Sequence, residues 1–325
     1  MSFYQNKKVL VTGGTGFIGS YLTEALVKAK AKVTVSSRSA DKLKFLKAVK
    51  SKIQIIKLDL KNSSAVDKLV KGQNHVFHLA AHVGGIHYNN SHPATLLSEN
   101  LLPAVNVIKA AKKAKVKKFL MVSSACVYPR FPTIPTPETE GFLDEPEPTN
   151  YGYGWAKRMM EVLAKTYSQE HHLKIGVVRP YNVYAPRDNF KPHQSHVIPA
   201  LIKKVCDGQN PVIVWGDGSP TRSFIYVDDV VRGMMLALEK YPQPDPVNLG
   251  TCEEISIKDL VRLIIKLSGK KTKVKFDTSK PNGQPRRQCD TKKAKKILGF
   301  EAKITLEQGL PQVISYYQKH VQKKD

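Results

Sequence analysis

Short apolar and β-branched runs alternate with longer segments of helical periodicity along the first half of the chain. Runs of seven or eight residues with strand character stand at 7–13, 31–37, 53–60, 74–81, 117–124 and 173–180. Apolar residues at helical spacing mark segments between them, at 19–30, 101–115 and 155–170. Strands that alternate with helices predict βαβ units, and hence an α/β fold with a doubly wound parallel Rossmann sheet.

Two interruptions divide this pattern. Proline recurs through 129–149, which predicts an irregular surface loop beside the functional site. After 179–190 the rhythm breaks into loops and short helices, and a strand-like run returns only at 247–251, followed by an amphipathic helix at 256–269. We therefore expect two units. The predicted boundaries are 1–184 for the Rossmann domain, with 224–251 returning to it, and 185–223 with 252–325 for a smaller C-terminal α/β substrate lobe.

Length and composition suit a globular protein with a substantial core. The chain has 325 residues, of which 41% are hydrophobic, and this excludes a disordered chain. No apolar run approaches the ~20 residues that span a bilayer, and the first residues pass directly into a strand, so we expect neither a membrane segment nor a signal peptide. The four cysteines show no disulfide-motif or metal-ligand spacing, which predicts a reduced cytoplasmic protein without a metal site.

The formal charge of +25 admits two interpretations, a nucleic-acid partner or solvated lysine-rich helix faces. We favour the second, because no basic motif interleaved with aromatic residues accompanies the lysines. No nucleic-acid partner is expected. A positive field would nevertheless favour an anionic substrate such as a nucleotide diphosphate.

A glycine-rich turn joins the first predicted strand to the first predicted helix. Gly14, Gly16 and Gly19 fit the spacing G-x-G-x-x-G, which serves a tight turn, close approach to a pyrophosphate and helix packing. The helix N-terminus adds unpaired N–H groups and a positive dipole end. The predicted dinucleotide-binding turn comprises Gly13, Gly14, Thr15, Gly16, Phe17, Ile18 and Gly19.

The end of the second strand bears on the choice of cofactor. NAD-specific sites usually carry an acid there for the ribose 2′-hydroxyl, whereas this chain has Ser36, Ser37 and Arg38. A guanidinium suits a 2′-phosphate, so we predict NADP(H), with NAD(H) as the alternative if Arg38 is only a solvated loop residue. Asp59, after the third strand, is predicted either to accept a hydrogen bond from the adenine amino group or to cap the next helix.

Three polar residues form a catalytic pattern. Tyr153 and Lys157 stand at i and i+4, on one face of a predicted helix, and Ser124 ends a predicted strand. A neighbouring ammonium is expected to stabilise the phenolate of Tyr153 and bring its pKa toward the working range. The serine hydroxyl would orient a substrate carbonyl.

These motifs resemble those of the extended short-chain dehydrogenase/reductase superfamily, in the same order along the chain. The matching segments are TGGTGFIG (12–19), HLAA (78–81), SSACVY (123–128), YGYGWAK (151–157) and RPYNVYAP (179–186). The resemblance implies that Ser124, Tyr153 and Lys157 are the catalytic triad. It also implies that family cofactor contacts fall on Leu60, Ala80, Ala81, Lys157, Pro180 and His196.

A closer resemblance is to the GDP-L-fucose synthase family. It is carried by AAHVGGI (80–86), SSACVYP (123–129), RDNF (187–190), SHVIPALI (195–202), VWGDGSPTRSFIYVDD (214–229) and KFDTSKPNGQPRR (275–287). It implies that Cys126 and His196 handle the epimerisation protons of a GDP-sugar in an NADPH-dependent 3,5-epimerase and 4-reductase. Implied substrate contacts are Asn182, Trp215, Arg222, Arg287 and Lys204, the last of these at a position that is often arginine.

Other functions remain open at this point. A GDP-mannose 3,5-epimerase has similar segments but a lysine in place of His196, and a UDP-sugar 4-epimerase needs neither Cys126 nor His196. A non-catalytic Rossmann sensor would not need the serine, tyrosine and lysine at this spacing. The resemblance further implies a homodimer that pairs through helices of the Rossmann domain.

Overall fold

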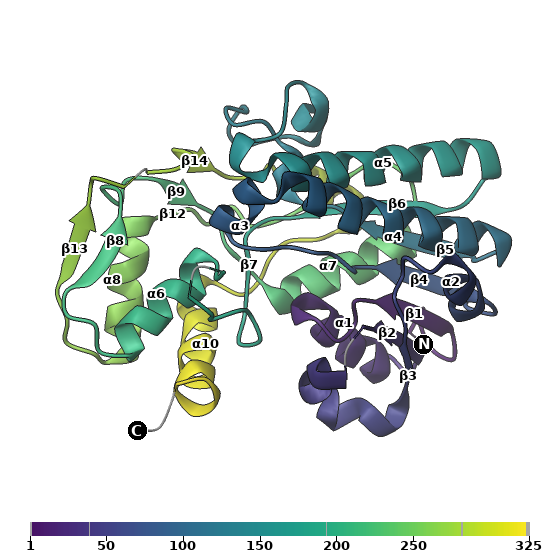
Figure 1. Ribbon diagram of the computed structural model, residues 1–325, viewed down its shortest axis with the longest axis horizontal. Coiled ribbons are helices and arrows are strands. Elements are labelled where there is room, and N and C mark those ends of the chain that lie inside the picture. Colours follow the sequence, from purple (N-terminus) through teal and green to yellow (C-terminus); the bar gives the residue numbers. More distant parts are fainter. Residues whose placement is uncertain (1, 39, 193, 281, 323–325) are drawn as a thin grey trace.

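A seven-stranded, all-parallel sheet forms the centre of the larger part of the molecule (Figure 1). The computed structural model describes residues 2–38, 40–192, 194–280 and 282–322. The strands are β1 (Lys8–Thr12), β2 (Lys32–Ser37), β3 (Ile53–Lys57), β4 (His75–His78), β5 (Lys118–Val122), β6 (Ile175–Pro180) and β11 (Val247–Leu249). Their order, β3-β2-β1-β4-β5-β6-β11, confirms the predicted doubly wound Rossmann sheet.

Helices cover both faces of this sheet, as a parallel sheet requires. One face carries α2 (Ser63–Val70), α4 (Pro93–Lys113) and α5 (Tyr151–His171), and the other carries α1 (Phe17–Lys28) and α7 (Val227–Lys240). Each face has its own hydrophobic cluster. Alternate strand residues such as Val11 and Leu10 point into opposite clusters, so the sheet is buried on both sides.

A smaller lobe of mixed structure follows and lies at the left of Figure 1. Its helices are α6 (Val197–Cys206), α8 (Ile257–Ser268) and α10 (Leu306–His320), whereas α9 (Lys292–Leu298) packs against β11 and α7 of the larger part. Its short strands are β8 (Val212–Trp215), β9 (Thr221–Arg222), β12 (Ile255–Ser256), β13 (Val274–Asp277) and β14 (Arg286–Arg287). A further pair of parallel strands is formed by β7 (Val183–Tyr184) and β10 (Ile225–Tyr226).

Short helices occupy the connections. These are α3 (Ile86–Ser91) and the 3-10 helices Ala40–Lys52, Ala125–Val127, Glu138–Phe142 and Pro148–Asn150. The last two interrupt the proline-rich segment 129–149, which is otherwise irregular, as its composition predicts. Within the described residues, no helix has the length and apolar character needed to cross a membrane.

The sequence located all six N-terminal strands but misplaced several helix ends. α5 begins at Tyr151 rather than at 155, so Tyr153 lies in its first turn. α4 begins at Pro93, eight residues before the predicted start, because proline is well tolerated at the first helical position. The division into 1–184 with 224–251, and 185–223 with 252–325, stays a prediction.

Candidate active site

The glycine-rich turn lies between β1 and α1, at the carboxyl edge of the sheet. Gly13 has φ +70, and a Cβ at this position would lie 2.8 Å from Cα of Ala80, which follows β4. A Cβ on Gly19 would lie 2.2 Å from the carbonyl oxygen of Gly13. Gly16 caps α1 with no side-chain hydrogen bond, so the backbone N–H groups of the first turn remain available to a ligand. This turn therefore fits a pyrophosphate.

The predicted 2′-phosphate position is at the end of β2. Arg38 is exposed there and lies close enough to Lys61 for the two cations to act on each other. Thr15, in the glycine turn, is buried, and its Oγ1 lies 3.0 Å from Oγ of Ser37. The glycine turn and the end of β2 are thus in direct contact.

Asp59 follows β3, and one of its two predicted roles is wrong. The cap of α2 is Asn62, whose Oδ1 accepts a hydrogen bond from the backbone N–H of Ala65 at 3.1 Å. Asp59 instead accepts from the backbone N–H of Lys61 at 2.9 Å. Leu60 beside it is buried. A contact from Asp59 to adenine stays a prediction.

Ser124, Tyr153 and Lys157 come together between the end of β5 and the first turns of α5. Ser124 lies close enough to Tyr153 for its side chain to lower the pKa of the phenol. Nζ of Lys157 lies 5.5 Å from the centre of the Tyr153 ring and donates to the carbonyl oxygen of Val122 at 2.8 Å. Tyr153 and Lys157 are both buried.

The Tyr153 pKa is raised, whereas we expected it to be lowered. Burial raises this pKa and Cys126 raises it further, while the hydrogen bond with Ser124 opposes them. Lys157 is not among the causes of this shift, and its ammonium donates to the carbonyl oxygen of Val122. Burial also lowers the pKa of Lys157 to about 8, against the opposing effects of Cys126 and Glu161. Tyr153 is therefore held as a neutral phenol, the form that donates a proton.

A buried ion pair that the sequence did not indicate lies near Lys157, and its carboxylate, that of Glu161, raises the Lys157 pKa. Glu161 stands one helical turn further along α5, and its carboxylate accepts two hydrogen bonds from Arg179 of β6, at 2.8 and 2.6 Å. Ser123, next to Ser124, donates to the same carboxylate at 2.5 Å. The i+4 spacing from Lys157 was the available signal.

Two arginines of the smaller lobe lie side by side, and one of them reaches Cys126. Arg222 and Arg287 are directly paired in the parallel strands β9 and β14. Nη2 of Arg287 lies 3.9 Å from Sγ of Cys126, and the backbone N–H of Cys126 donates to Oγ of Ser124 at 3.2 Å. Burial lowers the pKa of Arg222 to about 10, and Arg287 lowers it further while Glu147 opposes. Two adjacent guanidinium groups of this kind suit a diphosphate.

The other predicted substrate residues are more dispersed. Trp215, at the end of β8, has an exposed fraction of 61%. Asn182 follows Pro180 at the end of β6 and donates to the carbonyl oxygen of Ser223 at 2.8 Å. Nζ of Lys204 donates to the carbonyl oxygen of Ile213 at 2.7 Å, so its ammonium is already held by the backbone.

His196 is the N-cap residue of α6 and is 56% exposed. Its Nδ1 lies 3.3 Å from Oδ2 of Asp188. The structure thus brings Ser124, Cys126, Tyr153 and Lys157 together, whereas the contacts recorded for His196 within the described residues are to its own loop. The sequence did not indicate Asp188 as part of the site.

Comparisons with known proteins identify the family of the chain. Residues 9–250 match the model of the NAD dependent epimerase/dehydratase family. GDP-L-fucose synthase of Escherichia coli (strain K12) is 34% identical over 326 residues, with 96% of each chain covered. GDP-L-fucose synthase 1 of Arabidopsis thaliana is 33% identical over 323 residues, covering 98% of this chain and 95% of that protein. The crystal structure of UDP-glucose 4-epimerase from Thermotoga maritima, with UDP-glucose, is similar at 27% identity and a TM-score of 0.86, covering 97% of this chain and 100% of that one.

Proposed function

Because the chain belongs to the NAD dependent epimerase/dehydratase family, we propose that it converts GDP-4-keto-6-deoxy-D-mannose to GDP-L-fucose, by 3,5-epimerisation and NADPH-dependent 4-reduction. Its similarity to two GDP-L-fucose synthases over at least 95% of either chain supports this substrate. The observation that carries the proposal is the position of Cys126. Its backbone is bonded to Ser124 and its sulfur lies against Arg287, and a simple 4-epimerase has no use for a thiol there.

Epimerisation would begin from the C4 ketone, which acidifies the hydrogens on C3 and C5. Cys126, as a thiolate, removes a proton, and His196 returns one to the opposite face of the carbon. Ser124 and Tyr153 hydrogen-bond the developing enolate oxygen, where preorganised donors contribute ~3 kcal/mol each. In the reduction, Tyr153 then protonates the C4 oxygen.

The cofactor would be held by the glycine turn and the adjoining strand ends. NADPH supplies a hydride when bound. The pyrophosphate would lie on the N–H groups of α1, and Arg38 would hold the 2′-phosphate. The contacts predicted for Leu60, Ala80, Ala81, Pro180 and His196 complete the proposed site. NAD(H) is the alternative if Arg38 does not engage a phosphate.

Arg222 and Arg287 would bind the diphosphate of the GDP-sugar, with the exposed ring of Trp215 available to the base. Asn182 and Lys204 would complete the substrate contacts. A strongly basic chain favours such an anion electrostatically.

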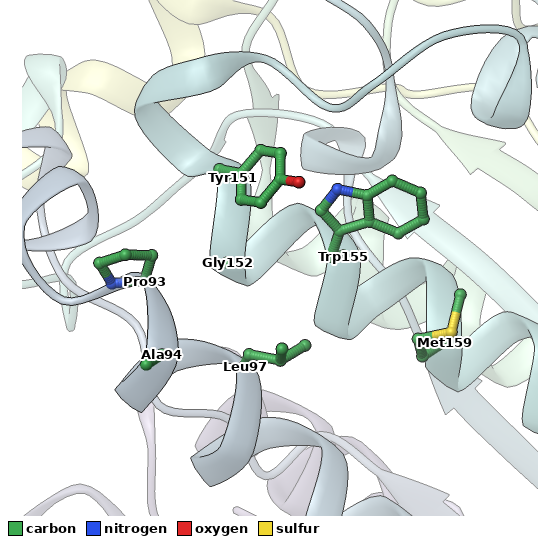
Figure 2. A pocket seen from close by; sticks show the side chains of 7 residues that line it. All are labelled: Pro93, Ala94, Leu97, Tyr151, Gly152, Trp155 and Met159. Carbon is green, nitrogen blue, oxygen red and sulfur yellow. The ribbon is translucent and has the colours of Figure 1, made fainter.

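A second copy of the chain would pack on α4 and α5. A groove of about 410 Å³ lies between them, and its lining side chains are those of Pro93, Ala94, Leu97, Tyr151, Gly152, Trp155 and Met159 (Figure 2). Further along the two helices, Leu102 and Val162 are 46% and 40% exposed. Apolar side chains along two neighbouring helices suit a homodimer interface. We expect light scattering to give a dimer for the wild type and a monomer for L102R; a wild-type monomer would contradict this part of the proposal.

The decisive experiment mixes the purified protein with NADPH and GDP-4-keto-6-deoxy-D-mannose, and follows loss of reduced-nicotinamide absorbance. We expect oxidation with GDP-L-fucose as product. C126A should lose epimerisation and retain some 4-reduction, and a C126A product that is still fully epimerised contradicts the assignment. If neither NADPH nor NADH is oxidised, deuterium incorporation from solvent into GDP-mannose would identify a redox-neutral epimerase instead.

A further inference from the structure

The loop between β7 and α6 holds a buried carboxylate against the ring of His196. The side chain of Asp188 is 4% exposed, compared with 56% for that of His196. Oδ1 of Asp188 accepts a hydrogen bond from the backbone N–H of Asn189 at 2.7 Å, which leaves Oδ2 to meet Nδ1 of the ring at 3.3 Å. The backbone of the loop therefore holds the carboxylate of Asp188 independently of its contact with His196.

The same loop is anchored to the helix that follows the glycine turn. Arg187, the neighbour of Asp188, donates to both carboxylate oxygens of Glu24 on α1, at 2.8 and 3.0 Å. It also donates to Oγ of Ser20 at 3.0 Å, and its guanidinium lies 4.3 Å from the ring centre of Tyr21. Asp188 thus has a fixed position relative to α1.

A carboxylate that can only accept requires the hydrogen on Nδ1 of the imidazole. Nε2 is then the nitrogen left for chemistry, and it belongs to a side chain that is more than half exposed. We propose that Asp188 is a positioning residue for His196, holding Nδ1–H so that Nε2 is the atom that delivers the proton during epimerisation. This inference rests on the proposed function.

The proton step balances without any further reactant. The Nε2–H bond of the imidazolium breaks as the electron pair of the enolate forms the new C–H bond. His196 is left as a neutral imidazole with its remaining hydrogen on Nδ1, and solvent restores the other.

Electrostatics within the described residues act in the same direction. The hydrogen bond with Asp188 is the main cause of a raised pKa of His196, and it outweighs the opposing effect of partial desolvation of the ring. Among the cations of these elements, Arg187 pairs with Glu24, and Lys203 and Lys204, later in α6, bind Asp207 and the backbone of Ile213. Lys191, in the same loop as His196, is exposed to solvent. The positive end of the α6 dipole disfavours an imidazolium at its N-cap, and the carboxylate of Asp188 offsets this unfavourable electrostatic interaction.

The test is an NMR titration of the full-length protein labelled with ¹³C-histidine. The His196 signal is identified among the ten histidines by its loss in H196N. We expect the wild-type midpoint to lie above the ordinary ~6.5 and to fall in D188N. The matched control is D207N, which removes a carboxylate that pairs with Lys203 in the last turns of the same helix, and it should leave the midpoint unchanged. A wild-type midpoint at or below ~6.5 overturns the proposal, whether or not D188N folds.

A kinetic measurement separates positioning from mere stability. The readout is deuterium exchange at C3 and C5 of GDP-4-keto-6-deoxy-D-mannose without NADPH, as a function of pH. Because a general acid contributes ~100-fold or more, we expect D188N to lose about tenfold or more of the exchange rate above neutral pH, and D188E to recover part of it. Equal pH profiles for wild type and D188N overturn the proposal. If the wild type exchanges nothing, the proposed substrate has failed, and the titration still decides whether Asp188 holds His196.

Discussion

Removing the charge of Glu161, whose side chain is buried, should lower the free energy of unfolding. The side chains of Glu161 and Arg179 are 4% and 1% exposed, and two hydrogen bonds join them. In E161Q the guanidinium stays buried without its counter-charge, a change that costs about 3–5 kcal/mol in comparable buried pairs. We expect the lower end, about 3 kcal/mol, because the amide oxygen still accepts one hydrogen bond and Arg179 keeps those to Tyr128 and the carbonyl of Glu138.

Urea denaturation followed by circular dichroism measures this loss as a lower free energy of unfolding. At about 2 °C per kcal/mol for a chain of this size, the melting temperature should fall by roughly 6 °C. The matched control is E170Q, the same substitution on the same helix at a side chain that is 75% exposed, and it should change stability by less than about 0.5 kcal/mol. If the free energy of unfolding of E161Q stays within about 1 kcal/mol of the wild-type value, the buried pair does not stabilise the fold as argued.

Three further predictions concern the site itself. R38S should reduce kcat/KM with NADPH by about tenfold to a hundredfold and leave the value with NADH nearly unchanged, since a charge-assisted hydrogen bond contributes ~1.5–3 kcal/mol; equal losses with both cofactors would contradict a 2′-phosphate contact. R222A should weaken GDP binding at least about tenfold in calorimetry without changing NADPH binding, because one of two paired guanidinium groups is lost. The ammonium of Lys157, with a pKa lowered to about 8, is lost as the pH rises through that value, so the rate of 4-reduction should decline above pH about 8. E161Q should move this decline to lower pH because Glu161 raises the Lys157 pKa, and an unchanged profile would show that the lysine charge is not required.

The strands and the glycine turn were predictable because their physical requirements are local. A parallel strand buried on both faces needs a nearly continuous apolar run, and β1 and β5 have one, whereas β3, at the edge of the sheet, is only partly buried. Gly13 and Gly19 mark places where no Cβ fits. The start of α4 was missed because its first two turns bury few apolar side chains: Leu96 is buried, but Ala94 and Leu97 are exposed.

Contacts between distant segments could not be predicted in this way. The register that pairs Arg222 with Arg287 joins strands 65 positions apart, and nothing in either segment alone specifies it. The pKa of Tyr153 was expected to fall because Lys157 is near in sequence, but the cost of burial and the orientation of the ammonium depend on the complete fold. Asp188 lies eight residues before His196, yet only the turn between them brings the two side chains together.

The late position of β11 in the chain has a consequence for biosynthesis. This strand pairs with β6 at the edge of the sheet, and its Asn248 accepts a hydrogen bond from Tyr128 at 2.6 Å and donates to the carbonyl of Thr136 at 3.1 Å. A nascent chain that ends before Val247 therefore presents the bare edge of β6, a template for pairing with other chains. It also lacks the amide that joins the proline-rich loop to the catalytic side of the sheet. Folding during translation must wait for three-quarters of the polypeptide, and premature termination would yield an aggregation-prone product rather than a smaller working enzyme.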